Sequence, residues 1–361
     1  MSKGSNILAL GADMKSRYLV ASGSKLEFGP EIGDLGEARN FAFFKRKVQQ
    51  VVKRTKPAII THDLHPGYFS TRLARRIGAE HPAASLLPVQ HHYAHIASVM
   101  AEFGLKGPAI GVALDGTGLG TDGNIWGGEF IVVRNRNFNR VGHFKYIRMP
   151  GGEKVISEIW RMVISILGRV GCPFLKDVEE IAKEMLISMM EKGINSPLTS
   201  SVGRIFDAAA SLTGVCREAA YEAEGPIKLE KLCDYKIKES YNFTISKNKG
   251  TFTIDVRPIF FELIKDLKKR TKRSVIATKF HNSMVMAVFK MVKKITEETG
   301  IKDVLLSGGV FQNSFLRRRL MEKLSKAGFK VFINEKTPVN DHNIALGQYY
   351  IAKNYPQTNS K

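Results

Sequence analysis

The chain has 361 residues, and 43% of them are hydrophobic, which is enough for one large two-lobed domain or two ordinary ones with well-packed cores. It contains no apolar run of the roughly 18 residues that signal a membrane span, and its first residues lack the apolar core of a signal peptide, so we expect a cytoplasmic protein without membrane contact. The net charge of +21 at pH 7 favours an anionic partner: a nucleotide, a nucleic acid or an acidic protein.

Two segments of the chain share one pattern. Residues 6–22, "NILALGADMKSRYLVAS", and residues 109–133 each contain two apolar runs around a turn with Asp and Gly, which predicts a β-hairpin. Each hairpin is followed by a helical pattern and then by a short buried strand, at 57–64 and at 303–310. Alternating strands and helices predict an α/β fold. Two such halves would enclose a cleft, which is a common place for a ligand.

The repeated pattern divides the chain into a first lobe, residues 1–107, and a second lobe, residues 108–361. Residues 153–250 are expected to form a largely helical insertion in the second lobe, because they contain amphipathic stretches such as "DVEEIAKEMLISMMEKG". All three cysteines, Cys172, Cys216 and Cys233, fall in this insertion without a C-x-x-C motif, so neither a zinc ribbon nor a disulfide framework is indicated.

Three of the nine histidines occur within five positions of "LPVQHHYAHIASVM", residues 87–100. If this stretch is helical, His91 and His95 lie one turn apart on one face, which suits two imidazoles on one metal ion, while His92 points elsewhere. No Glu follows His91, so the motif is not the H-E-x-x-H of a zinc protease. A pair of partly buried, hydrogen-bonded histidines without metal explains the pattern equally well.

Two aspartates are candidates to complete a metal site. Asp115 begins the Asp-Gly turn of the second hairpin, and Asp341 in "NDHNIALGQ" follows a predicted strand and precedes a helix. Their simpler roles are turn former and helix N-cap. A set of two His and two carboxylates suits iron, zinc or manganese, and the sequence does not choose among these metals.

Glycine-rich turns indicate an anion site. The loop "DGTGLGTDGNIWGG" that begins at Asp115 has backbone amides that an anion can approach closely, since no Cβ intervenes. "LSGGVFQN", residues 306–313, lies between a buried strand and a helix, where a phosphate or a nucleobase can bind. Asp207 falls among apolar residues of a helical pattern and therefore needs a partner such as a ribose hydroxyl. Ordinary strand-to-helix turns and an exposed Asp are the alternatives.

Two basic runs, "KDLKKRTKR" at 265–273 and "RRRLMEKLSK" at 317–326, have the pattern of charged helix faces. No aromatic residues interleave with these lysines as a stacking platform for nucleic acid requires. A nucleic-acid partner is therefore possible but not favoured.

The motifs, in this order, resemble the C-terminal carbamoyltransferase region of HypF, the maturation factor of [NiFe] hydrogenases. The resemblance spans nearly the whole chain. It rests on "LALGADMK", "IGDL", "HDLHPGYFST", "VQHHYAHIAS", "ALDGTGLGTDGNIWGGEF", "GRIFDAAASLTG", "FHNSM", "LSGGVFQN" and "ALGQ". HypF is in turn similar to TsaD, a tRNA threonylcarbamoyltransferase, and to TobZ, an O-carbamoyltransferase. The resemblance implies the two-lobed actin-like ATPase fold that these proteins share.

The resemblance also implies a site and a reaction. Its metal positions match His91, His95, Asp115 and Asp341, with iron as the implied metal and zinc or manganese as alternatives. Its nucleotide positions match Lys15, Asp115, Gly116, Thr117, Gly118, Gly120, Asp207, Gly225, Gly309 and Asn313. The implied ligand is ATP or carbamoyl-adenylate, and the implied reaction transfers the carbamoyl group to the C-terminal cysteine of a HypE-type acceptor. No catalytic acid or base is assigned.

The chain departs from the family pattern in two respects. HypF proteins carry acylphosphatase, zinc-finger and YrdC-like modules, and none is recognisable here, so we expect a separate YrdC-like protein to supply carbamoyl-adenylate. The segment "YEAEGPIKLE", residues 221–230, has a Gly-Pro that is more similar to the tRNA-modifying relatives. A tRNA-modifying or other O/N-carbamoyltransferase, and a non-catalytic nucleotide-binding scaffold, therefore stay open as alternatives.

Overall fold

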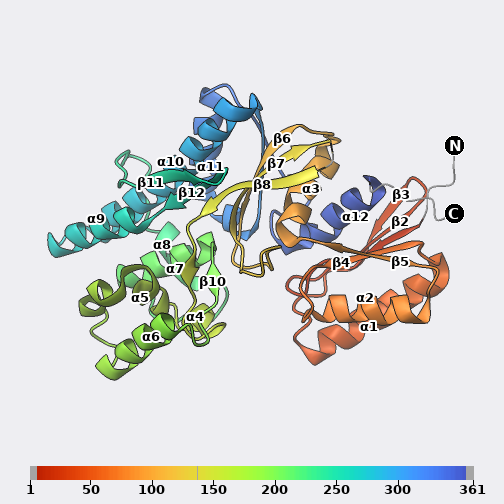
Figure 1. The fold of residues 1–361 in the computed structure, drawn as a ribbon, viewed down its shortest axis with the longest axis horizontal. Helices are drawn as coiled ribbons and strands as arrows, with labels where there is room; N and C mark the ends of the chain where they lie inside the picture. Colours follow the sequence, from red (N-terminus) through yellow and green to blue (C-terminus); the bar gives the residue numbers. More distant parts are fainter. Residues whose placement is uncertain (1–5, 136, 355–361) are drawn as a thin grey trace.

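The computed structural model describes residues 6–135 and 137–354, which form two lobes, each built on one β-sheet (Figure 1). The sheet of the first lobe has five strands in the order β3-β2-β1-β4-β5, with β1, β2 and β3 antiparallel and β4 and β5 parallel to β1. Its strands are β1 (Ile7–Ala9), β2 (Leu19–Ser22), β3 (Lys25–Phe28), β4 (Ile59–Asp63) and β5 (Ser85–Val89).

The alternation of side chains along β1 gives this sheet two apolar faces. Leu8 packs in the core formed with α1 (Ala38–Thr55) and α2 (Phe69–Glu80). Ile7 and Ala9 point the other way and pack against α12 (Ile344–Asn354). The first sheet is therefore covered by helices on both faces, as expected for parallel strands in an α/β layer fold.

The second sheet repeats this scheme. It has seven strands in the order β11-β12-β8-β7-β6-β13-β14, and the five from β8 to β14 have the same sequence of antiparallel and parallel neighbours as the whole first sheet. The repeated pattern in the sequence thus corresponds to a structural duplication. Its strands are β6 (Ala109–Leu114), β7 (Gly128–Arg134), β8 (Asn137–Phe144), β11 (Thr244–Asn248), β12 (Thr251–Asp255), β13 (Asp303–Ser307) and β14 (Lys330–Ile333).

Two helices lie between the lobes, and Figure 1 shows them side by side. Helix α3 (His91–Phe103) follows the first sheet in the chain, yet its apolar residues pack against β6, β7 and β13 of the second sheet. Helix α12 follows the second sheet, yet it covers the first. A division of the chain at residue 107/108 therefore separates the strands of the two sheets, while α3 and α12 each pack against the sheet of the other part.

The insertion is helical only in its first part. It contains β10 (Leu198–Thr199), which pairs with β9 (Ile147–Arg148) just before the insertion, and the short 3-10 helix η1 (Gly168–Phe174). Its helices are α4 (Lys154–Ser157), α5 (Arg161–Leu167), α6 (Glu180–Lys192), α7 (Val202–Leu212) and α8 (Glu224–Glu230). The predicted helical range to residue 250 was too long, because β11 and β12 form a hairpin at the edge of the second sheet. Positive φ angles at Lys249 and Gly250 form its two-residue turn.

Three long helices complete the second lobe: α9 (Arg257–Lys268), α10 (Arg273–Thr299) and α11 (Ser314–Lys326). The basic run at 317–326 is on α11 as predicted. The run at 265–273 is not one helix face, since α9 ends at Lys268 and α10 begins at Arg273. Within the described residues, no helix is long and apolar enough to cross a membrane, and the three cysteines are unpaired as expected.

Candidate metal and nucleotide site

The histidine pair is placed by the start of α3. The side chain of Gln90 caps this helix by accepting a hydrogen bond from the Tyr93 amide at 2.9 Å, so the helix begins at His91. His91 and His95 then lie one turn apart and are both fully buried. The same Gln90 donates to the carbonyl of Leu119 at 3.0 Å, which ties α3 to the loop that follows β6.

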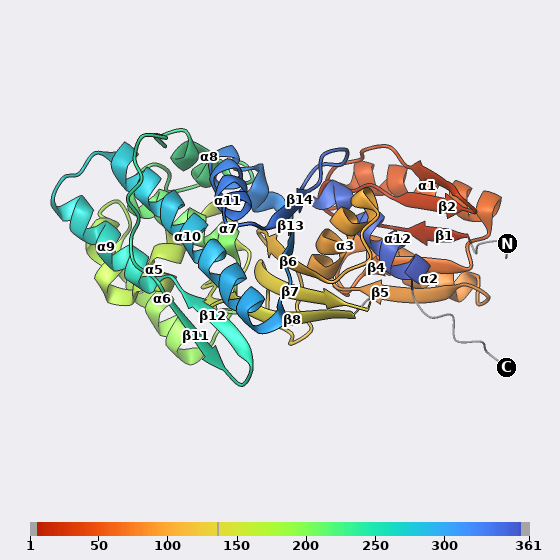
Figure 2. The same cartoon turned by 90° about the horizontal axis from the view of Figure 1, so that it is seen from above.

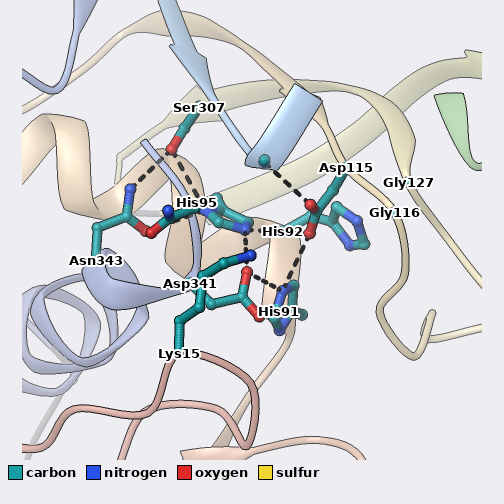
Figure 3. Close-up of polar contacts among 12 residues, drawn as sticks. Lys15, His91, His92, His95, Asp115, Gly116, Gly127, Ser307, Asp341 and Asn343 are labelled. Atoms are coloured by element: carbon teal, nitrogen blue, oxygen red, sulfur yellow. Dashed lines mark hydrogen bonds and ion pairs between the residues drawn. The ribbon is translucent and has the colours of Figure 1, made fainter. Parts of the chain in front are cut away.

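Two aspartates from other parts of the chain meet this pair (Figure 3). Asp115 follows β6, and Asp341 begins the 3-10 turn η3 (Asp341–Asn343) that leads into α12. The Asp115 Oδ2 atom lies 3.3 Å from the Nε2 atoms of both His91 and His95. The Asp341 Oδ1 atom lies 3.7 and 3.6 Å from the same two nitrogens. The four residues predicted as metal ligands are therefore brought together, with ligand atoms within 4.8 Å of one another.

Supporting hydrogen bonds turn both imidazoles toward the centre of this cluster. His91 Nδ1 donates to Asp63 Oδ2 at 2.8 Å, and His95 Nδ1 donates to Asn343 Oδ1 at 3.0 Å. Asp63 ends β4 and Asn343 lies two residues after Asp341, so the two supports come from different lobes. With each Nδ1 engaged, each Nε2 faces the carboxylates, an arrangement typical of metal-binding histidines. Neither Asp63 nor Asn343 was identified from the sequence.

The charges of the cluster depend on one another. Burial lowers the pKa of His91, but the nearby carboxylates of Asp341 and Asp115 and the hydrogen bond to Asp63 outweigh it and raise the pKa well above its usual value. Burial raises the pKa of Asp341, and His91 and His95 outweigh it, so the pKa falls to about 2. Two buried carboxylates thus require positive charge between them, either as protons on the imidazoles or as a cation.

The cluster fits a divalent metal ion. His91 Nε2 is buried and has no hydrogen-bond partner among the described residues, although it points at two carboxylates. Such an orphaned nitrogen is costly unless something binds it. Two imidazole nitrogens and two carboxylate oxygens suit iron, zinc or manganese. His92 has a different place: it packs against Trp126, and burial lowers its pKa well below the usual value, so it stays neutral.

A cavity of about 360 Å³ adjoins the cluster on the second-lobe side. Asp115 belongs to both, because it lines the cavity as well as facing the two histidines. Residues from both lobes form the walls, and they are Lys15, Asp115, Gly116, Gly203, Arg204, Phe206, Glu222, Ala223, Pro226, Ile227, Glu230, Gly309, Val310, Gln312 and Asn313. The cavity therefore shares Asp115 with the candidate metal cluster.

Five of the ten predicted nucleotide residues line this cavity: Lys15, Asp115, Gly116, Gly309 and Asn313. Lys15 reaches across from the first lobe and forms an ion pair with Glu222 at 2.6 Å. Burial lowers the pKa of Lys15, but Glu222, Asp341 and Asp115 outweigh it, so the pKa is raised and the ammonium keeps its charge. The Gly309 amide donates to Asp115 Oδ1 at 3.0 Å, which fixes the carboxylate toward the cluster.

The other five predicted residues do not line the cavity: Thr117, Gly118, Gly120, Asp207 and Gly225. A Cβ on Gly118 would lie 2.6 Å from the His92 ring, and one on Gly120 would lie 2.0 Å from the buried indole of Trp126. These two glycines are needed for close packing of their own loop. A Cβ on Gly225 would lie 2.7 Å from Ile159, so this glycine is a packing position as well.

Asp207 lies behind the cavity wall. It is buried on α7, and its carboxylate is 2.8 Å from the guanidinium of Arg204, one turn earlier. Burial raises the pKa of Asp207 to about 6, and Arg204 offsets this only in part. Arg204, which itself lines the cavity, therefore supplies a nearby positive charge, while Asp207 Oδ2 has no hydrogen-bond partner among the described residues. The sequence identified the need for a partner but not the residue.

Asn313 is held in one orientation by two hydrogen bonds. Its Oδ1 accepts from the Leu316 amide at 2.8 Å and caps α11. Its Nδ2 donates to His281 Nε2 at 3.0 Å, which is the acceptor because His281 Nδ1 donates to the Ala277 carbonyl at 2.8 Å. Burial lowers the pKa of His281 to about 4, so the ring is neutral near pH 7. The motif "FHNSM" thus supports a residue of the cavity wall.

The duplicated sheets, the helices between them and the site at the junction define a two-lobed actin-like ATPase fold. Two sequence models of the HypF family match the chain: the HypF Kae1-like domain over residues 2–102, and the second subdomain of the carbamoyltransferase Kae1-like domain over residues 111–348. The chain belongs to the HypF carbamoyltransferase family, of which it represents the Kae1-like region.

Individual relatives support this family assignment. The chain is 34% identical to carbamoyltransferase HypF2 of Cupriavidus necator over 97% of its own length and 46% of the relative's. It is 34% identical to a carbamoyltransferase HypF homolog of the same organism over 97% of its length and 92% of the relative's. A crystal structure of full-length HypF in the phosphate- and nucleotide-bound form superposes with a TM-score of 0.92, at 37% identity, over 98% of this chain and 56% of that one. The chain thus spans about half the length of most of these relatives.

Proposed function

We propose that this protein transfers a carbamoyl group from carbamoyl-adenylate to the C-terminal cysteine of a HypE-type acceptor. The observation that carries the proposal is the position of Asp115, which faces the histidine pair on one side and lines the cavity on the other. A nucleotide in the cavity would have its phosphate and acyl group beside the metal position. A scaffold that only bound nucleotides would not require the His-Asp cluster.

The cavity offers groups for each part of such a ligand. Lys15 supplies a positive charge and Gly116 and Gly309 supply an open backbone, which together suit a phosphate. Asn313 and Phe206 suit a ribose or a base. His91, His95, Asp115 and Asp341 would hold the metal, which supplies a Lewis acid when bound.

The reaction is an acyl transfer. The acceptor thiolate forms a bond to the carbamoyl carbon, the bond from that carbon to the phosphate oxygen breaks, and AMP leaves with the electron pair. The chain's own residues bind the adenylate, exclude water from the cavity and hold the leaving phosphate near Lys15. Carbamate itself is a poor electrophile, so the group must arrive activated. We propose that a separate YrdC-like carbamoyl-adenylate synthase supplies it in the cytoplasm.

The test follows the mass of the acceptor. We expect the 361-residue chain, given carbamoyl phosphate, ATP and a HypE-type protein, to turn over negligibly. Synthetic carbamoyl-adenylate should restore addition of one carbamoyl group to the acceptor, and replacement of the acceptor's C-terminal cysteine by serine should abolish it. The Asp341→Ala variant should be inactive with the adenylate, because it removes a predicted metal ligand.

Three results would change this assignment. Robust modification without any adenylate or synthase would show that the chain activates the carbamoyl group itself. Modification of tRNA in place of the cysteine acceptor would establish the tRNA-modifying alternative. Failure with preformed carbamoyl-adenylate on both acceptors would leave the nucleotide-binding scaffold.

A further inference from the structure

A second cavity, of about 490 Å³, lies on the outer surface of the second lobe between α10 and α11. Figure 2 shows these two helices side by side. We call this cavity the α10–α11 groove. Its lining is formed by Lys238, Asn282, Val285, Met286, Phe289, Arg319, Glu322, Lys323, Lys326 and Ala327. None of these residues lines the nucleotide cavity, so the groove is a separate feature of the molecule.

The groove has more positive than negative charge, because four cations line it beside one carboxylate, Glu322. Lys326 pairs with Glu322 at 2.6 Å. Lys238, Arg319 and Lys323 have no carboxylate within 4 Å in the part of the chain that the structure describes, although they come from two different segments and converge on one concave surface. Glu322 also lies in the field of Lys238 and Arg319, but one carboxylate does not balance four cations, so a further anionic group in the groove would relieve their repulsion.

The arginine of the groove is held in place. The Arg319 guanidinium donates to Asn282 Oδ1 at 3.1 Å and to the Tyr235 carbonyl at 2.6 Å, and it lies over the rings of Phe315 and Tyr235. Both hydrogen-bond acceptors are neutral, so the charge remains available. A fixed guanidinium loses little side-chain entropy when it binds a carboxylate, which favours specific recognition over diffuse attraction.

The floor of the groove is apolar. Met286 and Phe289 of α10 are half-buried, and Val285 beside them is buried. The ammonium of Lys323 lies 5.1 Å from the centre of the Phe289 ring. The groove therefore offers an apolar surface bordered by cations, which suits a ligand with one apolar side chain between carboxylates.

We propose that the α10–α11 groove binds an acidic peptide segment of a partner protein, with one apolar side chain on the floor and carboxylates on Arg319, Lys323 and Lys238. The apolar floor favours a peptide over a nucleic acid, since Phe289 and Met286 are half-buried beneath the cations rather than exposed for base stacking. The proposal stands apart from the carbamoyl-transfer reaction and is tested without it.

The position of the groove gives this binding a consequence. Helix α11 is capped by Asn313, in the wall of the candidate nucleotide cavity, and passes the groove at Arg319 and Lys323. The rise of ~1.5 Å per residue puts Lys323 about 15 Å along the helix from Asn313. A protein docked here through an acidic segment would have other parts within reach of the cavity.

The experiment measures binding of a fluorescein-labelled Glu-rich peptide with one central Leu by fluorescence anisotropy at a fixed ionic strength. The Arg319→Glu/Lys323→Glu variant should bind the peptide about tenfold more weakly than the wild type, because it reverses two charges at the groove. The matched control, Lys265→Glu/Lys268→Glu on α9, changes the net charge by the same amount at exposed positions outside the groove. This control should lose much less affinity for the peptide. A Leu→Ser peptide should also bind more weakly to the wild type.

A second variant guards against misfolding, since Arg319 makes structural hydrogen bonds. Lys323→Glu/Lys326→Glu leaves these bonds intact and should still weaken binding more than the control. Equal losses in the groove and control variants would overturn the proposal, because binding would then follow net charge alone. Insensitivity to the Leu→Ser change would also overturn it. So would a single-stranded oligonucleotide of the same charge that binds more tightly and depends more strongly on Arg319 and Lys323.

Discussion

The His-Asp cluster, our candidate metal site, and the cavity, our candidate nucleotide site, share Asp115, yet they relate to the sequence in different ways. All four residues expected in the cluster converge, although they come from α3, the end of β6 and the start of η3. Only half of those expected to contact the nucleotide line the cavity. The difference is chemical. Few side chains can bind a metal, and they must present their tips, whereas a cavity wall is formed by backbone and by any residue of the right size.

The supports of the two regions differ as well. The cluster is oriented by Asp63 and Asn343, which are themselves polar and buried. Much of the cavity wall comes from the segment 221–230, where Glu222, Ala223, Pro226, Ile227 and Glu230 line it. Each prediction below changes one region and leaves the other as its reference.

The largest effect is expected from removing a metal ligand. His91→Ala should weaken metal binding by more than the ~10–100-fold that loss of a supporting partner costs, because it removes one of four ligand atoms. The measurement is a metal titration with elemental analysis of the purified protein. His92→Gln, on the same helix but outside the cluster, should retain the metal. Metal at wild-type stoichiometry in the double variant His91→Ala/Asp341→Ala would refute the site.

Two glycines of one loop should separate packing from binding. Gly120→Ala should lower the free energy of unfolding by about 1–3 kcal/mol, since its Cβ would collide with the buried Trp126 ring. Gly116→Ala meets nothing within 4 Å and should leave stability within about 0.5 kcal/mol, while it weakens AMP binding because Gly116 lines the cavity. Urea unfolding and calorimetry measure the two effects. Equal stability of both variants would show that the loop adapts to a Cβ at Gly120.

Loss of a supporting carboxylate should cost less than loss of a ligand. Asp63→Ala should weaken metal binding about tenfold, because His91 would lose the bond that orients its ring. Asp63→Asn keeps an acceptor for His91 Nδ1 and should therefore lose less metal affinity than Asp63→Ala. Metal titration of the wild type, Asp63→Asn and Asp63→Ala gives the order of their metal affinities. If Asp63→Ala binds as tightly as the wild type, the helix alone orients His91.

The smallest effect concerns the support of Asn313. His281→Ala should weaken AMP binding about threefold, in line with loss of a hydrogen bond of ~0.5–1.5 kcal/mol that orients the Asn313 amide. A double-mutant cycle with Asn313→Ala isolates the interaction. Strictly additive losses would mean that His281 acts on stability and not through Asn313.

His281 should also show itself in the dependence of stability on pH. Its pKa is about 4 in the folded protein and near 6.5 when unfolded, so the unfolded chain binds its proton first as the pH falls. The wild type should therefore lose stability from pH 6.5 toward pH 4, and His281→Ala should lose less over the same range. Thermal unfolding at several pH values provides the comparison. If stability depends on pH in the same way in both proteins, a group other than His281 titrates in this range.

The sequence by itself determined the duplicated α/β scheme, the helix that carries His91 and His95, and the four metal-ligand candidates. These follow from local patterns: apolar alternation, a one-turn spacing of imidazoles and Asp at the ends of strands. The hairpin at β11 and β12 was also visible in "SKNKGTFTID", but its Lys-Gly turn was included in a helical range. Missing it lengthened the predicted insertion.

Only the tertiary structure decided which residues face one another across the lobes. The exchange of α3 and α12 depends on two apolar surfaces that meet in three dimensions, and it brings Asp341 within 3.7 Å of His91 although they are far apart in the chain. The close packing of Gly118 and Gly120 against two buried rings, His92 and Trp126, was likewise visible only in the fold. The position of Arg204, 2.8 Å from the buried Asp207 carboxylate and one turn earlier on the same helix, was also decided by the fold, because burial makes a carboxylate without a nearby cation costly.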